Sequence, residues 1–195
     1  MSSSEADGAR ITELALQARA GDRGAAALFV RVMQRDVLRF VTHLAGRAEA
    51  EDLTQETFFR ALRALPGFQG RSSARTWLLT IARRTVVDHI RATTRRPRLV
   101  PVPDWVTTAD ARADDEESRI DEHVLVNRLI AQLDQDRREA FVATQVLGLS
   151  YAEAAEVCGC PVGTIRSRVA RARDDLVAAW SAGAPPRAEA AAGHL

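Results

Sequence analysis

The part of the chain that most restricts its fold is residues 148–176, GLSYAEAAEVCGCPVGTIRSRVARARDDL. Ser150 and Glu153 have the spacing of a capping box, in which each side chain accepts a hydrogen bond from the backbone amide of the other residue. The helix that starts there should end just before Gly159, because glycine tolerates the tight turn that follows. Pro161 suits the first position of a second helix, where its missing N–H is not needed. Two short helices joined at a glycine predict a helix-turn-helix.

The second of these helices has two different faces when it is projected at about 100° per residue. One face is apolar and should be buried, and it carries Ile165, Val169, Ala172 and Leu176. The opposite face carries Gly163, Ser167, Ala170, Arg171 and Asp174, with Arg166 and Arg168 at its sides. Small residues allow close approach to DNA, and arginine can bind guanine or phosphate with two hydrogen bonds. The alternative is an ordinary basic amphipathic helix. However, the capping box, the glycine in the turn, the proline and the two different faces of the second helix together favour DNA recognition.

Two cysteines, Cys158 and Cys160, flank the predicted turn. A metal centre would need further ligands at suitable spacing, and the four histidines are scattered along the chain. A thiol oxidoreductase would need a partner base or a cofactor motif, and neither is apparent. Free cysteine behaves as a small hydrophobe in such turns. We therefore expect packing thiols, no metal, no cofactor and no enzymatic activity.

The rest of the chain is predicted to be helical in two blocks. Apolar residues recur at helical spacing over 11–20, 25–44, 49–65, 74–94, 124–133 and 137–147, and no stretch alternates as a strand would. Between the blocks, three prolines and an acidic run indicate an extended linker. We predict an all-α protein of two small helical domains, with a flexible leader over 1–9, domains over 10–95 and 121–180, a linker over 96–120 and a flexible tail over 181–195.

Composition and charge restrict the setting and the partners. No apolar run approaches the roughly 20 residues that cross a bilayer, and the N-terminus lacks the features of a signal peptide, so we expect a cytoplasmic protein without membrane insertion. The net charge is +1, but arginines concentrate in residues 71–98 and 166–173, with an acidic stretch at 110–122 between them. Two basic patches favour two contacts with a polyanion, the alternative being solvated helix faces.

The helix predicted over 49–65 has an outward face with an aromatic residue among charged ones. Phe58, Ala61, Leu62 and Leu65 project to the buried side. The other side carries Asp52, Gln55, Glu56, Phe59 and Arg63. Such a face is a candidate protein-docking surface, although Phe59 alone could be a partly covered surface residue.

A loop with small polar residues precedes the helix over 74–94 in the stretch FQGRSSARTWLLTIARRTVVDHIR. Arginines could follow the phosphates of a single strand while the loop forms a pocket for an unstacked base. For Trp77, a place in the core is the alternative.

Three motifs in this order and spacing resemble one protein family. DLTQETFFRAL, ARTWLLTIARRTVVDHIR and the helix-turn-helix segment are similar to those of the extracytoplasmic-function group of sigma-70 factors, and the similarity covers residues 10–178. It implies a protein that binds core RNA polymerase, recognises the −35 and −10 promoter elements and promotes strand opening without covalent chemistry.

The resemblance also implies roles for particular residues. The β′ clamp helices of the polymerase would bind Asp52, Gln55, Glu56, Phe59 and Arg63. The −10 element would meet Arg71, Ser72, Ser73, Ala74, Arg75, Trp77, Arg83, Arg84, Asp88 and Arg91. The −35 element would meet Arg166, Ser167, Ala170 and Arg171, on a domain that also contacts the β-flap. The linker would run toward the RNA exit path.

Three positions depart from the family pattern: Arg84 stands where Asn is frequent, Asp134 where a proline commonly opens the turn, and Ala170 where a larger side chain is usual. We expect altered −10 contacts, a looser turn and greater dependence on Arg166 and Arg171. Anti-sigma factors are common partners in this group, but no residue identifies one. No small-molecule substrate is expected, and the protein would lie on the nucleoid within the holoenzyme. A helix-turn-helix regulator that does not join polymerase is the alternative function; it leaves the docking face unexplained.

Overall fold

The computed structural model describes residues 3–95 and 126–183, and within these ranges the chain is helical with no strand. The first block contains α1 (Ser3–Arg19), α2 (Arg23–Ala45), α3 (Arg47–Ala64), the single 3₁₀ turn η1 (Leu65–Gly67) and α4 (Ala74–Arg95). The second block contains a helical segment at 126–132 and then α6 (Gln135–Phe141), η2 (Val142–Val146, a π-helical turn), α7 (Tyr151–Cys158) and α8 (Val162–Gly183). The predicted all-α class is confirmed.

Helix α2 is the central element of the first block and contacts α1, α3 and α4. The Asp22 side chain caps it by accepting a hydrogen bond from the amide of Ala25 at 3.0 Å. Gly46, with φ +93°, makes the turn into α3, a conformation that residues with a Cβ rarely adopt. The buried face of α2 consists of Ala25, Phe29, Met33, Val37, Phe40, Val41 and Leu44. This apolar face packs against α1, α3 and α4 and so contributes to the core of the first block.

The helix-turn-helix forms as its sequence predicts. Ser150 and Glu153 make a complete capping box at the start of α7. Gly159 ends α7 in the left-handed conformation, with φ +64°. Pro161 lies one residue before α8 rather than inside it, and its carbonyl accepts the first hydrogen bonds of that helix, from Thr164 and Ile165.

Three local expectations differ from the structure. Helix α1 begins at Ser3, so most of the predicted leader is helical; its glutamate and alanines are good helix formers that extend the first turn. Leu62 was predicted to be buried but is exposed, and Val32, one of the apolar residues of the helix predicted over 25–44, is also exposed. In both helices, the buried face contains fewer apolar residues than the helical pattern of the sequence predicted. The predicted linker, 96–120, and residues 184–195 of the predicted tail lie outside the described residues.

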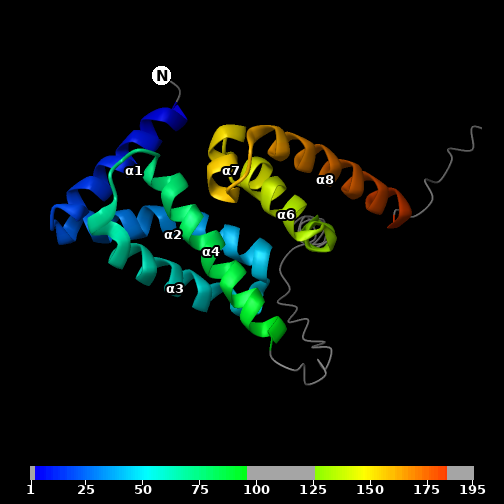
Figure 1. Ribbon diagram of the computed structural model, residues 1–195, viewed down its shortest axis with the longest axis horizontal. Helices are drawn as coiled ribbons and strands as arrows, with labels where there is room; N and C mark the ends of the chain where they lie inside the picture. Colours follow the sequence, from blue (N-terminus) through cyan, green and yellow to red (C-terminus); the bar gives the residue numbers. More distant parts are fainter. Residues whose placement is uncertain (1–2, 96–125, 184–195) are drawn as a thin grey trace, which may run out of the picture.

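The two blocks pack against each other (Figure 1), which the sequence analysis did not anticipate. Helix α4 lies along α7, and α2 also contacts α6 and η2. One continuous cluster of buried apolar residues runs from Ala15 in α1 to Val169 in α8. This docked arrangement decides which of the predicted functional residues are accessible.

Candidate functional site

The predicted docking face of α3 is exposed. Phe59 is 56% exposed, and Asp52, Gln55 and Arg63 are exposed around it. The Arg63 guanidinium carbon lies 5.4 Å from the centroid of the Phe59 ring, within the range of a cation–π contact. An aromatic ring held in place by a neighbouring cation is a preorganised contact for a protein partner. Buried Phe58 and Ala61 on the opposite side of α3 keep this face outward.

Arg60 connects this face to α4, and the sequence analysis missed it. Its Nε donates to Glu56 at 2.7 Å and its Nη1 donates to Asp88 at 2.9 Å. The spacing of Glu56 and Arg60, four residues apart on one helix, is a signal that could have revealed the first contact. These hydrogen bonds raise the pKa of Arg60. Glu56 and Asp88, predicted to meet different partners, are thus joined by one guanidinium.

The loop before α4 is well anchored. The Ser73 hydroxyl accepts from the amide of Thr76 at 3.1 Å and so caps α4, while the amide of Ala74 donates to the Thr12 hydroxyl of α1 at 3.1 Å. Trp77 is partly buried, with its ring centroid 4.9 Å from that of Phe68. The alternative reading of Trp77 as a packing residue therefore describes its surroundings well.

Two arginines predicted to meet the −10 element, Arg75 and Arg83, have contacts with the second block in this structure. Arg75 donates from Nε to Asp36 at 2.7 Å and from Nη2 to the carbonyl of Leu147 at 2.6 Å. Arg83 donates from Nε to Glu139 of α6 at 2.5 Å. The contacts with Leu147 and Glu139 bridge α4 and the second block, whereas Asp36 belongs to α2 of the first block. In the docked arrangement these two guanidiniums are already occupied.

The Arg83–Glu139 pair lies at the centre of the contact. Glu139 is 1% exposed, and its other carboxylate oxygen accepts from Gln135 at 3.2 Å. Burial alone would lower the pKa of Arg83, but the hydrogen bond and charge of Glu139 outweigh it and raise the pKa. Nothing in the sequence indicated this partner, because 56 positions separate the two residues.

The remaining −10 candidates are divided between loop and helix. Arg71, Arg84, Asp88 and Arg91 are exposed, and Ser72 is half-buried. Arg84 and Arg91 have no carboxylate within ion-pair distance among residues 3–95 and 126–183. The exposed residues of α4 lie toward its C-terminal half, so the structure separates an accessible half of the helix from the half that Arg75 and Arg83 commit to the second block.

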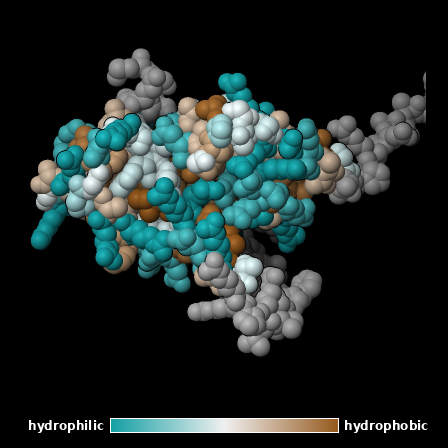
Figure 2. All heavy atoms as spheres, in the orientation of Figure 1, coloured by the Kyte–Doolittle hydropathy of each residue, from teal (hydrophilic) through white to brown (hydrophobic). Residues whose placement is uncertain are grey.

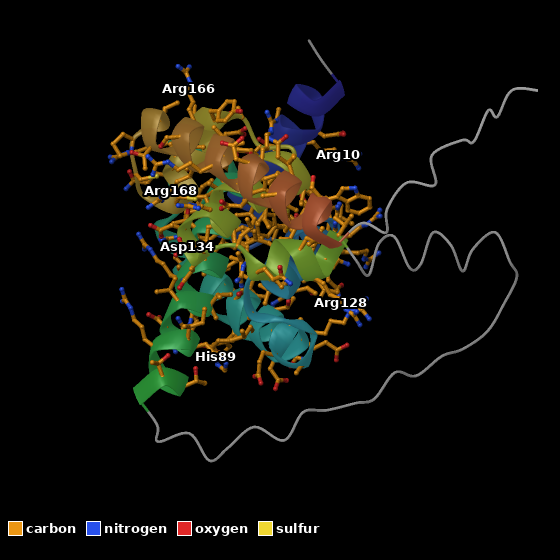
Figure 3. All side chains as sticks on the ribbon, turned by 90° about the vertical axis from the view of Figure 1, so that its right-hand side faces the viewer. Arg10, His89, Arg128, Asp134, Arg166 and Arg168 are labelled. Carbon is orange, nitrogen blue, oxygen red and sulfur yellow. The ribbon has the colours of Figure 1, made fainter. Side chains whose placement is uncertain are left out.

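Helix α8 presents the predicted recognition face to solvent. Ile165, Val169 and Ala172 are buried, while Gly163, Ser167, Ala170 and Arg171 are exposed. Figure 3 shows Arg166 pointing outward at the edge of the molecule. Arg173, also exposed, donates to the side chain of Gln145 at 2.8 Å. The two-sided pattern of this helix is confirmed.

Arg168 of α8 and Asp134, which precedes α6, have structural contacts that the sequence did not reveal. Arg168 pairs with Asp136 of α6, and its Nη1 lies 3.6 Å from the sulfur of Cys160. Asp134 accepts from the amide of Asp136 at 3.1 Å and caps α6. The residue expected to loosen this turn thus supplies a helix cap in place of the usual proline.

Cys158 lies in the core of the helix-turn-helix, and Cys160 lies at the edge of that core. Cys158 is buried, and burial raises the pKa of its thiol to about 12. Cys160 is half-buried. No group of three or more potential metal ligands occurs within the part of the chain that the structure describes. Nor does any helix of that part have the length and apolarity to cross a membrane.

Both blocks match family models. Residues 29–96 match the model described as sigma-70 region 2, and residues 123–176 match the one described as sigma-70, region 4. The first match contains the exposed face of α3 and the whole of α4, and the second contains the helix-turn-helix. A regulator that shares only the helix-turn-helix would lack the first match, so the alternative that we kept open is not supported.

Individual relatives agree along nearly the whole length. The ECF RNA polymerase sigma factor SigC of Mycobacterium tuberculosis is 52% identical over 91% of this chain and 95% of that protein. The RNA polymerase sigma-H factor of Pseudomonas aeruginosa is 36% identical over 84% of this chain and 90% of that protein. Among solved structures, CnrH in complex with the cytosolic domain of CnrY covers 90% of this chain and 99% of that chain, with a TM-score of 0.70 and 27% identity. The sigma factor RpoE of Bartonella quintana, in complex with the anti-sigma factor NepR, covers 80% of this chain and 96% of that chain, with a TM-score of 0.60 and 26% identity.

Proposed function

This chain belongs to the extracytoplasmic-function sigma factors of the sigma-70 family, and from that premise we propose how its residues share the work of transcription initiation. As a sigma factor it binds core RNA polymerase and recognises promoter DNA. The observation that carries the assignment of residues is the separation of two exposed surfaces, one on α3 and one on α8, on the two blocks that match regions 2 and 4. We propose domain limits of 10–95 and 121–180 for these blocks.

The face of α3 is the proposed contact with the β′ clamp helices. Phe59 supplies apolar area that desolvates on binding, and Arg63 holds its ring in place. The exposed side chains around them, Asp52 and Gln55, provide a polar rim that selects the partner. Aromatic and arginine side chains of this kind commonly carry most of the free energy of an interface.

The loop at 70–75 and helix α4 form the proposed −10 site. Arg84, Arg91 and Arg71 are accessible to phosphates, while Ser72 and Ser73 line the loop that would hold an extruded base. Extruding a base costs a few kcal/mol, which contacts made only to the separated strand must offset. The protein therefore acts by binding and strand capture, without covalent chemistry.

The exposed face of α8 is the proposed −35 site. Ser167 and Ala170 are small enough to let the helix enter the major groove, and Arg166 and Arg171 can donate to guanine or phosphate. Each phosphate that is neutralised on duplex DNA should add about 0.9 to the logarithmic salt slope.

The docked arrangement implies a step before the −10 element is engaged. Arg75 and Arg83 are bonded to the second block, so a protein in this form cannot offer them to DNA. We assign the docked form to the free protein, and we expect the two blocks to separate when polymerase and promoter are bound. The free energy of binding must exceed that of docking.

Partners and place in the cell follow from the family. The solved relatives CnrH and RpoE are bound to CnrY and to the anti-sigma factor NepR, and we extend this class of partner to the present chain. Since its other partners are polymerase and promoter DNA, we place the protein in the cytoplasm, on the nucleoid when it is part of the holoenzyme.

Run-off transcription with purified core polymerase tests the proposal. The wild-type protein should start specific transcripts with core enzyme alone, and Phe59→Ala should lower their yield by weakening holoenzyme assembly. Arg23→Ala, at an exposed position on α2 outside the proposed sites, is the matched control. Specific initiation that is unaffected by Phe59→Ala, with full holoenzyme assembly, would remove the α3 face from the polymerase contact.

A further inference from the structure

A crevice between the two blocks has no role in the function proposed above. Its volume is about 880 Å³, and it lies where the end of α2 and the start of α3 face residues 127–131 and Arg138. The face of the molecule in Figure 2 is mostly hydrophilic. The residues that line the crevice include more arginines than carboxylates.

Four arginines line this crevice, two from each block: Arg39 and Arg47, and Arg128 and Arg138. Glu51 is the one carboxylate among the lining residues. Within residues 3–95 and 126–183, none of the four arginines forms an ion pair, whereas Arg60, Arg75, Arg83, Arg137 and Arg168 all do. Among the described lining residues, positive charge therefore exceeds negative charge, with four arginines against Glu51.

Arg138 shows that the charge is partly desolvated. Its Nη2 donates to the carbonyls of Ala131 and Leu133, at 2.5 and 2.8 Å, but its Nε is buried without a hydrogen-bond partner among the described residues. Burial is also the main reason that the pKa of Arg138 is lowered. Nearby, burial and then the charge of Arg39 lower the pKa of His43. Solvated surface arginines would not carry a buried, unsatisfied donor.

The size and lining of the crevice restrict what could occupy it. A guanidinium binds phosphate oxygens with two parallel hydrogen bonds, and several guanidiniums around one space favour more than one phosphate. The volume is within the range of about 300–1,000 Å³ found for small-molecule sites. No phenylalanine, tyrosine or tryptophan is among the described lining residues, and His43 is the one aromatic ring there, so the crevice lacks the series of aromatic rings on which successive bases of a single strand stack.

We propose that this crevice binds a small anion carrying two or more phosphate groups, such as a nucleoside polyphosphate, between arginines of both blocks. Figure 3 shows Arg128 on a different side of the molecule from Arg166, so the site is separate from the −35 surface. A ligand held by Arg39 and Arg47 on one side and by Arg128 and Arg138 on the other binds fully only when the blocks are docked. Because such a ligand binds the docked form more tightly than the separated form, it shifts the equilibrium between them toward the docked form.

Isothermal titration of the full chain with inorganic pyrophosphate, ATP and adenosine, at one low ionic strength, tests the site. The variant is Arg39→Gln/Arg128→Gln, and the matched control is Arg10→Gln/Arg23→Gln, since all four residues are exposed. Pyrophosphate and ATP should saturate one site in the wild type, and adenosine should not bind. The variant should bind at least about tenfold more weakly, equivalent to about 1.4 kcal/mol, and the control within about twofold of wild type.

Several results would overturn the proposal. Equal weakening in the variant and the control would mean diffuse attraction by net charge, and lack of saturation would mean a solvated surface. Adenosine binding as tightly as ATP would remove the phosphates from recognition. Binding of an oligonucleotide that is tighter than that of ATP and is lost in the variant would assign the crevice to nucleic acid.

Two further measurements separate this site from the transcription function. In Glu139→Gln, where the ion pair between the blocks is removed, saturating pyrophosphate should lower the radius of gyration, measured by small-angle X-ray scattering, and adding Arg39→Gln/Arg128→Gln should abolish this change. No effect of pyrophosphate on the radius of gyration of Glu139→Gln would contradict binding between docked blocks. Without ligand, the Arg39→Gln/Arg128→Gln variant should support run-off transcription at the wild-type level; loss of transcription would place these arginines in the polymerase or promoter interface instead.

Discussion

The pair of Arg83 and Glu139 offers a direct way to disturb the docked arrangement without touching a proposed binding surface. Glu139→Gln keeps the size of the side chain and removes its charge. Glu139 is 1% exposed and lies outside the residues assigned to DNA or polymerase, whereas changing Arg83 would also alter the proposed −10 site. The variant therefore weakens docking without changing any residue assigned to DNA or polymerase.

The expected size of the effect follows from the surroundings of the pair. A hydrogen bond to a charged group contributes about 1.5–3 kcal/mol. The Arg83 side chain keeps 24% of its exposure in the docked form, so its guanidinium can turn partly to water when the carboxylate is replaced. We therefore expect Glu139→Gln to lower the free energy of docking by the lower end of this range, about 1.5 kcal/mol. This change shifts the equilibrium between the docked and separated forms about tenfold toward the separated form.

Two assays measure this shift. The radius of gyration from small-angle X-ray scattering should rise in Glu139→Gln, and a fluorescent single strand carrying the −10 element should bind more tightly, by up to about tenfold if the docked form predominates in the wild type. Glu156→Gln, an exposed carboxylate on α7, is the matched control. An unchanged radius together with unchanged affinity, or an equal change in the control, would show that the ion pair does not hold the blocks together.

Three other expectations concern the separate surfaces. Arg171→Ala should weaken −35 binding by about 1–3 kcal/mol in a footprinting titration, and protection that is unchanged across the −35 box would exclude it from recognition. Phe59→Ala should weaken binding to core polymerase, measured by fluorescence anisotropy, while the midpoint of thermal unfolding stays near that of wild type because the ring is exposed; a large drop in the midpoint would mean that Phe59 is a packing residue. Cys158 should resist alkylation at pH 8.5, where Cys160 reacts, because burial raises the pKa of Cys158 to about 12. Since the unfolded thiol ionises near pH 9 and the folded one does not, the free energy of unfolding should fall between about pH 9 and 12; Cys158→Ala should flatten that part of the pH profile, and an identical slope in this variant would exclude the thiol as the cause.

Local patterns predicted most of the fold because the forces behind them are local. The capping box at Ser150 and the left-handed turn at Gly159 depend on neighbouring residues, and both formed as expected. The two faces of α8 follow from helical period alone, with Ile165 buried and Arg171 exposed. The resemblance to a sigma factor family, drawn from three motifs, is confirmed by the family matches.

Contacts between distant segments could not be predicted in the same way. Arg83 has the same pattern in the sequence whether it faces DNA or Glu139, and only the packing of the second block on α4, which brings Glu139 of α6 to Arg83, decides between them. Asp134 illustrates the same limit on a smaller scale, because an aspartate can loosen a turn or cap a helix, depending on the backbone around it. The assignment of residues to the −10 and −35 elements remains a prediction.

The docking of the two blocks also limits the length of DNA that the protein can span. The positions that name the −10 and −35 elements differ by about 25 base pairs, which corresponds to about 85 Å at the rise of about 3.4 Å per base pair of B-form DNA. A compact chain of this size has a diameter of about 40 Å, estimated from its expected radius of gyration. While its two blocks are docked, the protein is shorter than the distance between the two sequences that it must recognise. Simultaneous occupancy of both elements on straight DNA would therefore itself report that the molecule has opened.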